Sequence, residues 1–174
     1  MRFKICFAAL AATVVTASPA FAQQASANAQ AKGTVLQPLT LSRFIDLDFG
    51  TVSSDPLVAG TVSVDVTVPG SPARNKTGGV TLVPSTWQPA RFDGTGEPGR
   101  AFTLTLTAPA TLVNGGNSIN VNSMVLDTCN CTTDTRSADV AGNFTVYVGG
   151  DFAIAPNQAS GLYTANFAVT ADYQ

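Results

Sequence analysis

The last fourteen residues, Gly161 to Gln174, read GLYTANFAVTADYQ, and this stretch decides how the rest of the chain is interpreted. From Tyr163 to Tyr173, apolar or small residues at odd positions alternate with mostly polar residues at even ones. In an extended chain the odd-numbered side chains share one side, which is typical of a strand with one buried face. Such a strand has an edge that another segment must pair with or cover.

The first 22 residues have the features of a secretory signal peptide. Arg2 and Lys4 precede an apolar stretch at 5–17, and the small-x-small motif AFA ends at Ala22. We therefore expect cleavage between Ala22 and Gln23. The apolar stretch is too short to span a membrane and no second one follows, so we expect an exported protein whose mature chain has no membrane span.

The mature chain would have 152 residues (174 minus 22), enough for one domain with its own core. Without Arg2 and Lys4, seven basic residues face eleven acidic ones, which gives a net charge of about −4. This balance and the lack of a basic cluster argue against a nucleic-acid partner. The sequence contains no histidine, the commonest general base and metal ligand. We expect no cofactor, no metal and no catalytic activity.

Residues 23–34 form an alanine- and glutamine-rich extension ahead of the domain, 35–174. Its small residues again alternate with mostly polar ones, and they continue in phase to Val35. If this extension is a donor strand, the residues that face its partner would be Ala25, Ala27, Ala29, Ala31 and Val35. One interpretation is a flexible tail left after cleavage. The other is a strand that adds to the sheet edge of a partner, where main-chain hydrogen bonds supply much of the affinity.

Short strand-like stretches separated by turn residues fill the remainder, and no helical period is present. The clearest is 61–68, where valines alternate with Thr, Ser and Asp. The clusters at 75–79 and 149–151 are typical of loops or hairpin turns. About nine or ten short strands predict an all-β, immunoglobulin-like (pilin-like) β-sandwich. The candidate stretches number eleven, three of them only three residues long, and lie at 35–42, 46–52, 61–68, 80–83, 90–92, 101–107, 111–113, 118–126, 143–148, 152–154 and 161–173.

The motifs DLDFG (46–50), GEPG (96–99) and NQASGLY (157–163) resemble the exported bacterial family DUF4402. The terminal stretch also resembles the last strand of chaperone–usher pilus subunits, with matches at Gly161, Phe167, Val169 and Tyr173, and Tyr163 belongs to the same strand. The order of the first and last motifs is similar to that of spore-coat-U-like subunits, although this chain lacks their cysteine near the first domain strand. The pilus resemblance implies a groove beside the last strand that receives a neighbour's extension.

That resemblance implies further partners and a location. The partners would be other copies or related subunits, a periplasmic chaperone and an outer-membrane usher. The location would be the periplasm and then the cell surface or the medium of a Gram-negative bacterium. The function would be that of a non-catalytic structural subunit of a fimbria-like surface fibre. The alternative is a self-contained secreted β-sandwich that acts as a binding or adhesion module, and an exported enzyme is a distant third.

Cys129 and Cys131 lie in a polar loop and can form an intrachain disulfide, remain free or pair between chains, or contribute to a metal site. The bridge is the favoured alternative. Asp127, Asp134 and Asp139 share this loop, and we interpret them as solvated rather than catalytic. The glycine pattern at 94–99 matches a dinucleotide-binding motif in letters, but a strand follows it rather than a helix, so we expect a turn.

Overall fold

The computed structural model describes residues 24–67 and 70–174, and within these ranges every regular element is a strand. The expected signal peptide, residues 1–22, and the expected cleavage position between Ala22 and Gln23 lie outside the described residues. The expected all-β fold is confirmed. The strands are β1 (Thr40–Ile45), β2 (Val52–Ser54), β3 (Gly60–Asp65), β4 (Ala73–Gly78), β5 (Val80–Leu82), β6 (Ala90–Thr95), β7 (Ala101–Thr107), β8 (Thr111–Asn114), β9 (Asn117–Leu126), β10 (Thr133–Ser137), β11 (Asn143–Ile154) and β12 (Ala168–Tyr173).

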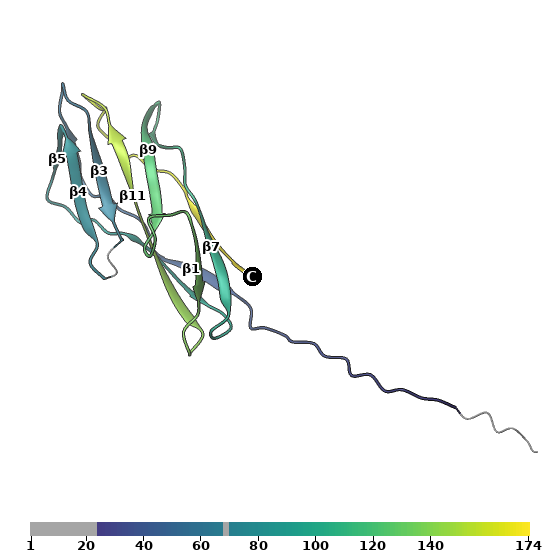
Figure 1. Cartoon of the computed structure of the whole chain (residues 1–174). Helices are drawn as coiled ribbons and strands as arrows, with labels where there is room; N and C mark the ends of the chain where they lie inside the picture. Colours follow the sequence, from purple (N-terminus) through teal and green to yellow (C-terminus); the bar gives the residue numbers. More distant parts are fainter. Residues whose placement is uncertain (1–23, 68–69) are drawn as a thin grey trace, which may run out of the picture. The chain divides into compact units, whose positions relative to one another are not determined.

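The strands form antiparallel sheets that pack face to face as a β-sandwich (Figure 1). One layer follows the order β1-β6-β11-β3-β4, with β9 on the other edge of β11 and β8 beside β9. The opposite layer consists of β10-β7-β12 and the short pair β2-β5. Each layer buries one face, which explains the alternation along strands such as β7, where Phe102, Leu104 and Leu106 are buried between threonines.

Two hydrophobic clusters lie between the layers. The first joins β7 to β6, β9 and β11 and contains Phe102 and Phe144, whose ring centroids are 4.4 Å apart. The second lies toward β3 and β5 and contains Val62, Val80 and Phe152. Residues of the terminal stretch contribute to both clusters: Phe167 packs against the first and Tyr163 against the second. The C-terminal segment therefore runs along the whole length of the core.

β11 corrects one sequence-based expectation. Residues 149–151 do not form a hairpin turn, because β11 continues through them to Ile154 (Figure 1). At this point the strand changes partner on one edge, from β6 to β3, while β9 stays on the other edge. A Cβ at Gly149 would lie 2.2 Å from the Val64 carbonyl oxygen. The glycine is thus required by close strand approach rather than by a turn.

β4 and β10 correct a second expectation, since both occupy polar stretches that the sequence assigns to loops. β4 includes residues 75–78 and pairs with β3, and β10 pairs with β7. Both lie at sheet edges, and most of their side chains are exposed. Backbone pairing alone defines such strands, so they leave no hydrophobic alternation in the sequence. The 94–99 pattern covers the end of β6 and the turn to β7, where the Arg100 N–H donates to the Glu97 carbonyl.

The two N-terminal strands of the domain are shorter than expected. β1 begins only at Thr40, after Pro38, and β2, Val52–Ser54, shares only Val52 with the expected strand at 46–52. Between them, the β-bridge that the described residues 46–51 form joins Asp48 to Gln88. The chain divides into two units at Thr34 and Val35. In the first, residues 24–34 are exposed and form no regular element.

Candidate strand-binding groove

The C-terminal segment, residues 161–173, pairs along one edge only. β12 pairs with β7, and further up the segment Thr164 exchanges two backbone hydrogen bonds with Val113 of β8 at 2.9 and 3.0 Å. Within residues 24–67 and 70–174, no strand pairs with the other edge of β12. The odd-numbered residues from 163 to 173 are partly buried and the even-numbered ones are exposed. The predicted period of two is therefore present. The inward-facing side chains of the C-terminal segment are only partly buried.

A second segment, residues 46–52, lies across from it. Asp48 exchanges backbone hydrogen bonds with Gln88, each 2.9 Å long. Leu47 and Phe49 point inward: Leu47 packs against the first cluster and Phe49 against the second. The Phe49 ring meets Phe152 edge-on at 4.7 Å between centroids. Packing therefore holds this segment, although regular pairing does not.

A cleft of about 720 Å³ separates the two segments. Residues 46–52 line one wall and residues 161–167 the other. Its floor is made by apolar side chains from β8, β9 and β11, namely Leu112, Ile119, Val121, Met124 and Phe152. An apolar floor between two extended segments has the shape that accommodates one more strand. We call this cleft the groove.

Part of the backbone on each wall of the groove has no backbone partner among the described residues. Because Asp48 directs its N–H and C=O toward Gln88, the backbone groups of Leu47 and Phe49 point the opposite way. Thr164 likewise uses its groups on Val113, which leaves those of Tyr163 and Ala165 on the groove side. Across the described parts of the chain, none of these four residues makes a backbone–backbone hydrogen bond. The groove thus has two unpaired strand edges, which invite strand addition.

The rim of the groove carries charge on one wall only. Asp46 forms an ion pair with Arg43 at 2.7 Å, and both side chains are largely exposed. Asp48 accepts a hydrogen bond from the Gly50 N–H at 2.7 Å and has no cationic partner among the described residues. The exposed positions of the opposite wall, Leu162, Thr164 and Asn166, are uncharged. The wall at 46–52 is therefore acidic.

The sequence-predicted groove residues divide between two roles. Tyr163 and Phe167 line the groove, and Gly161 stands at its end with φ of 143°, a conformation that favours glycine. Val169 and Tyr173 instead pack against the first cluster beside β7. The floor and the wall at 46–52 were not predicted as parts of this site, because their contacts with the C-terminal segment are distant in sequence.

The Tyr173 hydroxyl fixes Gln37, near the beginning of the domain, through hydrogen bonds. It donates to the Gln37 carbonyl oxygen at 2.9 Å and accepts from the Glu97 N–H at 2.6 Å. The Gln37 N–H in turn donates to a Glu97 carboxylate oxygen at 3.0 Å. Residue 37 is thus tied to the domain from both sides. Of the predicted donor residues, Ala25, Ala27, Ala29 and Ala31 are exposed, and Val35 is 95% exposed.

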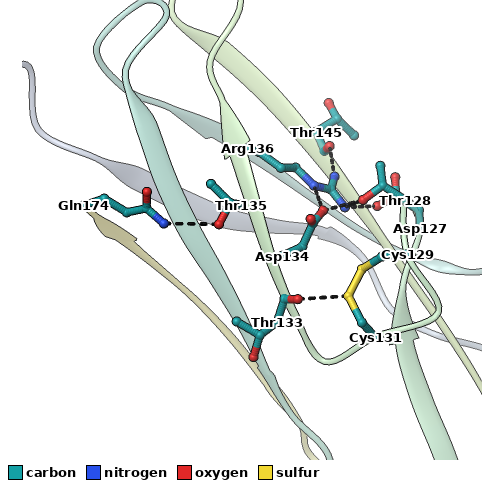
Figure 2. Close-up of polar contacts among 10 residues, drawn as sticks. All are labelled: Asp127, Thr128, Cys129, Cys131, Thr133, Asp134, Thr135, Arg136, Thr145 and Gln174. Carbon is teal, nitrogen blue, oxygen red and sulfur yellow. Dashed lines mark hydrogen bonds and ion pairs between the residues drawn. A yellow bond between two sulfur atoms is a disulfide. The ribbon is translucent and has the colours of Figure 1, made fainter.

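A separate polar cluster lies at the β9–β10 connection and is centred on Arg136 (Figure 2). Its guanidinium donates to Asp127 at 2.5 Å and to Asp134 at 2.7 Å, with all three side chains mostly buried. Thr128 also donates to Asp134. Asp127 is therefore buried and paired rather than solvated, which corrects its sequence-based interpretation. Cys129 and Cys131, in the same connection, are joined by a disulfide.

The electrostatics of this cluster suit a structural role. Burial alone would raise the pKa of Asp134, but hydrogen bonds from Thr128 and Arg136 and the positive charge of Arg136 bring that pKa below its ordinary value. Within the described ranges no three His, Cys, Asp or Glu side chains gather as a metal site would require. The same described ranges contain no helix that is long and apolar enough to cross a membrane.

The fold and the groove define a class of protein: an all-β sandwich with an apolar groove between two extended segments. The chain belongs to the family described as a domain of unknown function (DUF4402), whose model matches residues 39–173. This match contains both walls of the groove and leaves the N-terminal extension outside it. Comparison with curated proteins and with solved structures finds no match.

Proposed function

We propose that this protein is a non-catalytic structural subunit of a surface fibre, assembled by strand complementation. The N-terminal extension of one copy, residues 23–34, would occupy the groove of the next copy, between residues 46–52 and 161–167. The observation that carries this proposal is the groove itself, with an apolar floor and unpaired backbone on both walls. A chain that presents such a site needs an occupant, because exposed strand edges promote uncontrolled aggregation.

The extension has the properties of that occupant. Its small residues alternate with mostly polar ones, so one face can enter the groove while the other stays in water. Its main-chain groups would pair with the open edges at Leu47, Phe49, Tyr163 and Ala165, and such pairing supplies much of the affinity in strand addition. The same open edges explain why export would require a periplasmic chaperone to cover the groove, and an usher to exchange it for a neighbour.

Export to the cell surface of a Gram-negative bacterium is part of this proposal. The signal-peptide-like pattern of residues 1–22 and the resemblance of the terminal stretch to pilus subunits support it. In this arrangement the fibre would be a surface structure of the fimbrial kind that contributes to adhesion. No catalytic step is involved, and the chemistry consists of main-chain hydrogen bonding and apolar burial.

The experiment that tests this function places a charge on each face of the extension. Ala29→Asp puts a carboxylate on the face that enters the groove, where burial without a partner costs several kcal/mol, far more than one methyl contributes. We expect it to abolish polymers on denaturing gels of unheated cell-surface extracts. Asn28→Asp, on the opposite face, is the matched control and should leave most polymers intact.

Deletion of residues 23–32 should act like Ala29→Asp. If the wild-type chain, co-expressed with a cognate chaperone and usher, remains monomeric, the fibre function is wrong and a self-contained secreted module is favoured. If polymers form but neither Ala29→Asp nor the deletion reduces them, the extension is not the donor.

A further inference from the structure

We infer that the extension enters the neighbour's groove antiparallel to residues 46–52, with Ala31 opposite Phe49 and Lys32 opposite Asp48. This register rests on the proposed function and adds to it the identity of the pairing partner, a second copy of this chain, and the residues that align the two copies. Four independent features of the described residues lead to the same register: face, hydrogen-bond pattern, charge and reach.

The first feature is which side chains face inward. On the wall at 46–52, Phe49 packs on Phe152 in the core, whereas Asp48 is exposed. In the extension, Ala31 belongs to the small-residue face and Lys32 to the polar face. Directly opposed residues in a sheet share a face. Odd-numbered donor residues must therefore stand opposite odd-numbered residues of the wall, which permits Ala31 with Phe49 and Lys32 with Asp48.

The second feature is the hydrogen-bond pattern of the open edge. Asp48 directs both of its backbone groups to Gln88, so the groups that remain for an added strand belong to Leu47 and Phe49. In an antiparallel pair, hydrogen-bonded and non-hydrogen-bonded residue pairs alternate. Ala31 with Phe49 is then a hydrogen-bonded pair, and Lys32 with Asp48 is a non-hydrogen-bonded one. Side chains approach most closely in pairs of the second kind.

The third feature is charge. Lys32 is the only charged residue between positions 23 and 42. On the acidic wall, Asp46 is neutralised by Arg43, which leaves the Asp48 carboxylate without a cation among the described residues. The other wall presents no charge at its outward positions. One cation on the donor and one unpaired anion on the acceptor therefore select a single alignment.

The fourth feature is reach. Gln37 is held by Tyr173 and Glu97 of its own domain. In a parallel arrangement with Lys32 at Asp48, Leu36 would stand opposite Val52 inside the neighbour's groove, one residue from that anchor. The antiparallel arrangement places residues 31–34 opposite 49–46 instead, on the part of the wall that precedes the left-handed backbone conformation of Gly50 (φ 71°). It leaves residues 35–36 as a connection to the anchored Gln37.

The register is tested by joining two different copies through cysteine. One full-length chain carries Lys32→Cys and a second carries Asp48→Cys, and the two are expressed together and oxidised gently. Opposed non-hydrogen-bonded residues have Cα atoms close enough for a disulfide. We expect a reducible link between the two chains, seen on non-reducing gels. Gln30→Cys with Asp48→Cys is the matched control, since this diagonal pair is about 7–8 Å apart and should link poorly.

A charge exchange gives a second measurement that does not depend on cysteine. Lys32→Asp and Asp48→Lys should each weaken assembly about threefold, the effect of one cross-strand charge pair, and the double variant should restore it. A stronger link from Gln30 than from Lys32, or no recovery in the double variant, overturns the register. If Ala29→Asp still abolishes polymers in that case, the fibre function stands and only the alignment is wrong.

Discussion

At the scale of single residues, Arg136 is the centre of a mostly buried cluster of ion pairs. It joins Asp134, on its own strand β10, to Asp127 in the connection that follows β9, at a site where the Arg136 side chain is 12% exposed and that of Asp127 is 9% exposed. A buried ion pair adds little net stability compared with an apolar replacement, but removing one partner leaves an uncompensated charge. Asp127 therefore depends on Arg136, and the β9–β10 connection depends on both.

We predict that Arg136→Met destabilises the domain by about 3–5 kcal/mol, because the buried Asp127 loses its counter-charge. Urea denaturation of the full chain measures the change. Arg43→Met is the matched control: it breaks the exposed pair with Asp46 and should cost about 1 kcal/mol or less. Equal effects of the two substitutions would contradict the structural role assigned to the buried cluster.

The lowered pKa of Asp134 predicts a dependence of stability on pH. Its folded-state pKa lies below the unfolded value of about 3.9, so its ionised form stabilises the fold above that value, and this contribution is lost as the pH falls through the folded pKa. Asp134→Asn should therefore reduce the free energy of unfolding at pH 7. It should also flatten the decline in that free energy on acidification below about pH 4. Parallel decline in variant and wild type would show that Asp134 does not contribute.

At the scale of elements, β11 is the strand on which the sandwich depends, because it contacts β3, β6 and β9. Its middle contains two adjacent glycines, which are unfavourable in an isolated strand. Their presence follows from crowding: neighbouring backbones on both edges approach more closely than a side chain allows. Local propensity is here overridden by tertiary packing.

Gly149→Ala tests this explanation. The new Cβ would lie 2.2 Å from the Val64 carbonyl oxygen, so β3 and β11 must separate, and we expect a loss of about 1–3 kcal/mol. Gly116→Ala is the control, because no atom lies within 4 Å of the Cβ that it adds. Thermal unfolding followed by circular dichroism measures both. Comparable melting temperatures for the two variants would rule out the steric explanation.

At the scale of the whole molecule, the side chains that form the floor of the groove are larger than those that the extension offers to it. The floor is lined by Met124, Phe152 and other large side chains, whereas the extension offers alanines. In the proposed fibre, main-chain pairing would therefore provide most of the contact between subunits, and apolar filling less. Such a joint is weaker than one made by a donor with larger side chains, and it can be strengthened by enlarging one residue.

We predict that Ala29→Leu tightens the joint between subunits. Three added carbons at about 0.8 kcal/mol each give about 2.4 kcal/mol, which corresponds to a roughly sixtyfold slower dissociation of polymers. The measurement is the rate at which purified fibres release subunits in denaturant. Asn28→Leu, on the exposed face, should leave the rate nearly unchanged. A faster release from Ala29→Leu would show that the groove has no room for larger side chains.

The fold class, and the alternation of apolar and polar side chains along strands, could be predicted from the amino-acid sequence alone. Period-two patterns such as those of β7 and the C-terminal segment depend only on neighbouring residues, so they could be read without coordinates. The possible disulfide between Cys129 and Cys131 could also be predicted from local features, because the two residues are neighbours in the sequence. The edge strands β4 and β10 could not, because backbone pairing to a distant partner leaves no pattern in side chains.

The position of the groove and the residues that form it could be identified only from the three-dimensional structure. Leu47, Tyr163 and Met124 are far apart along the chain, and their meeting in one groove results from long-range strand order. The absence of backbone partners on both walls is likewise a property of the assembled sheets. The burial of Asp127 beside Arg136 could not be inferred from a polar loop, since burial depends on what the rest of the chain places over it. Sequence periodicity determines which face of a strand is apolar, while packing determines what that face meets.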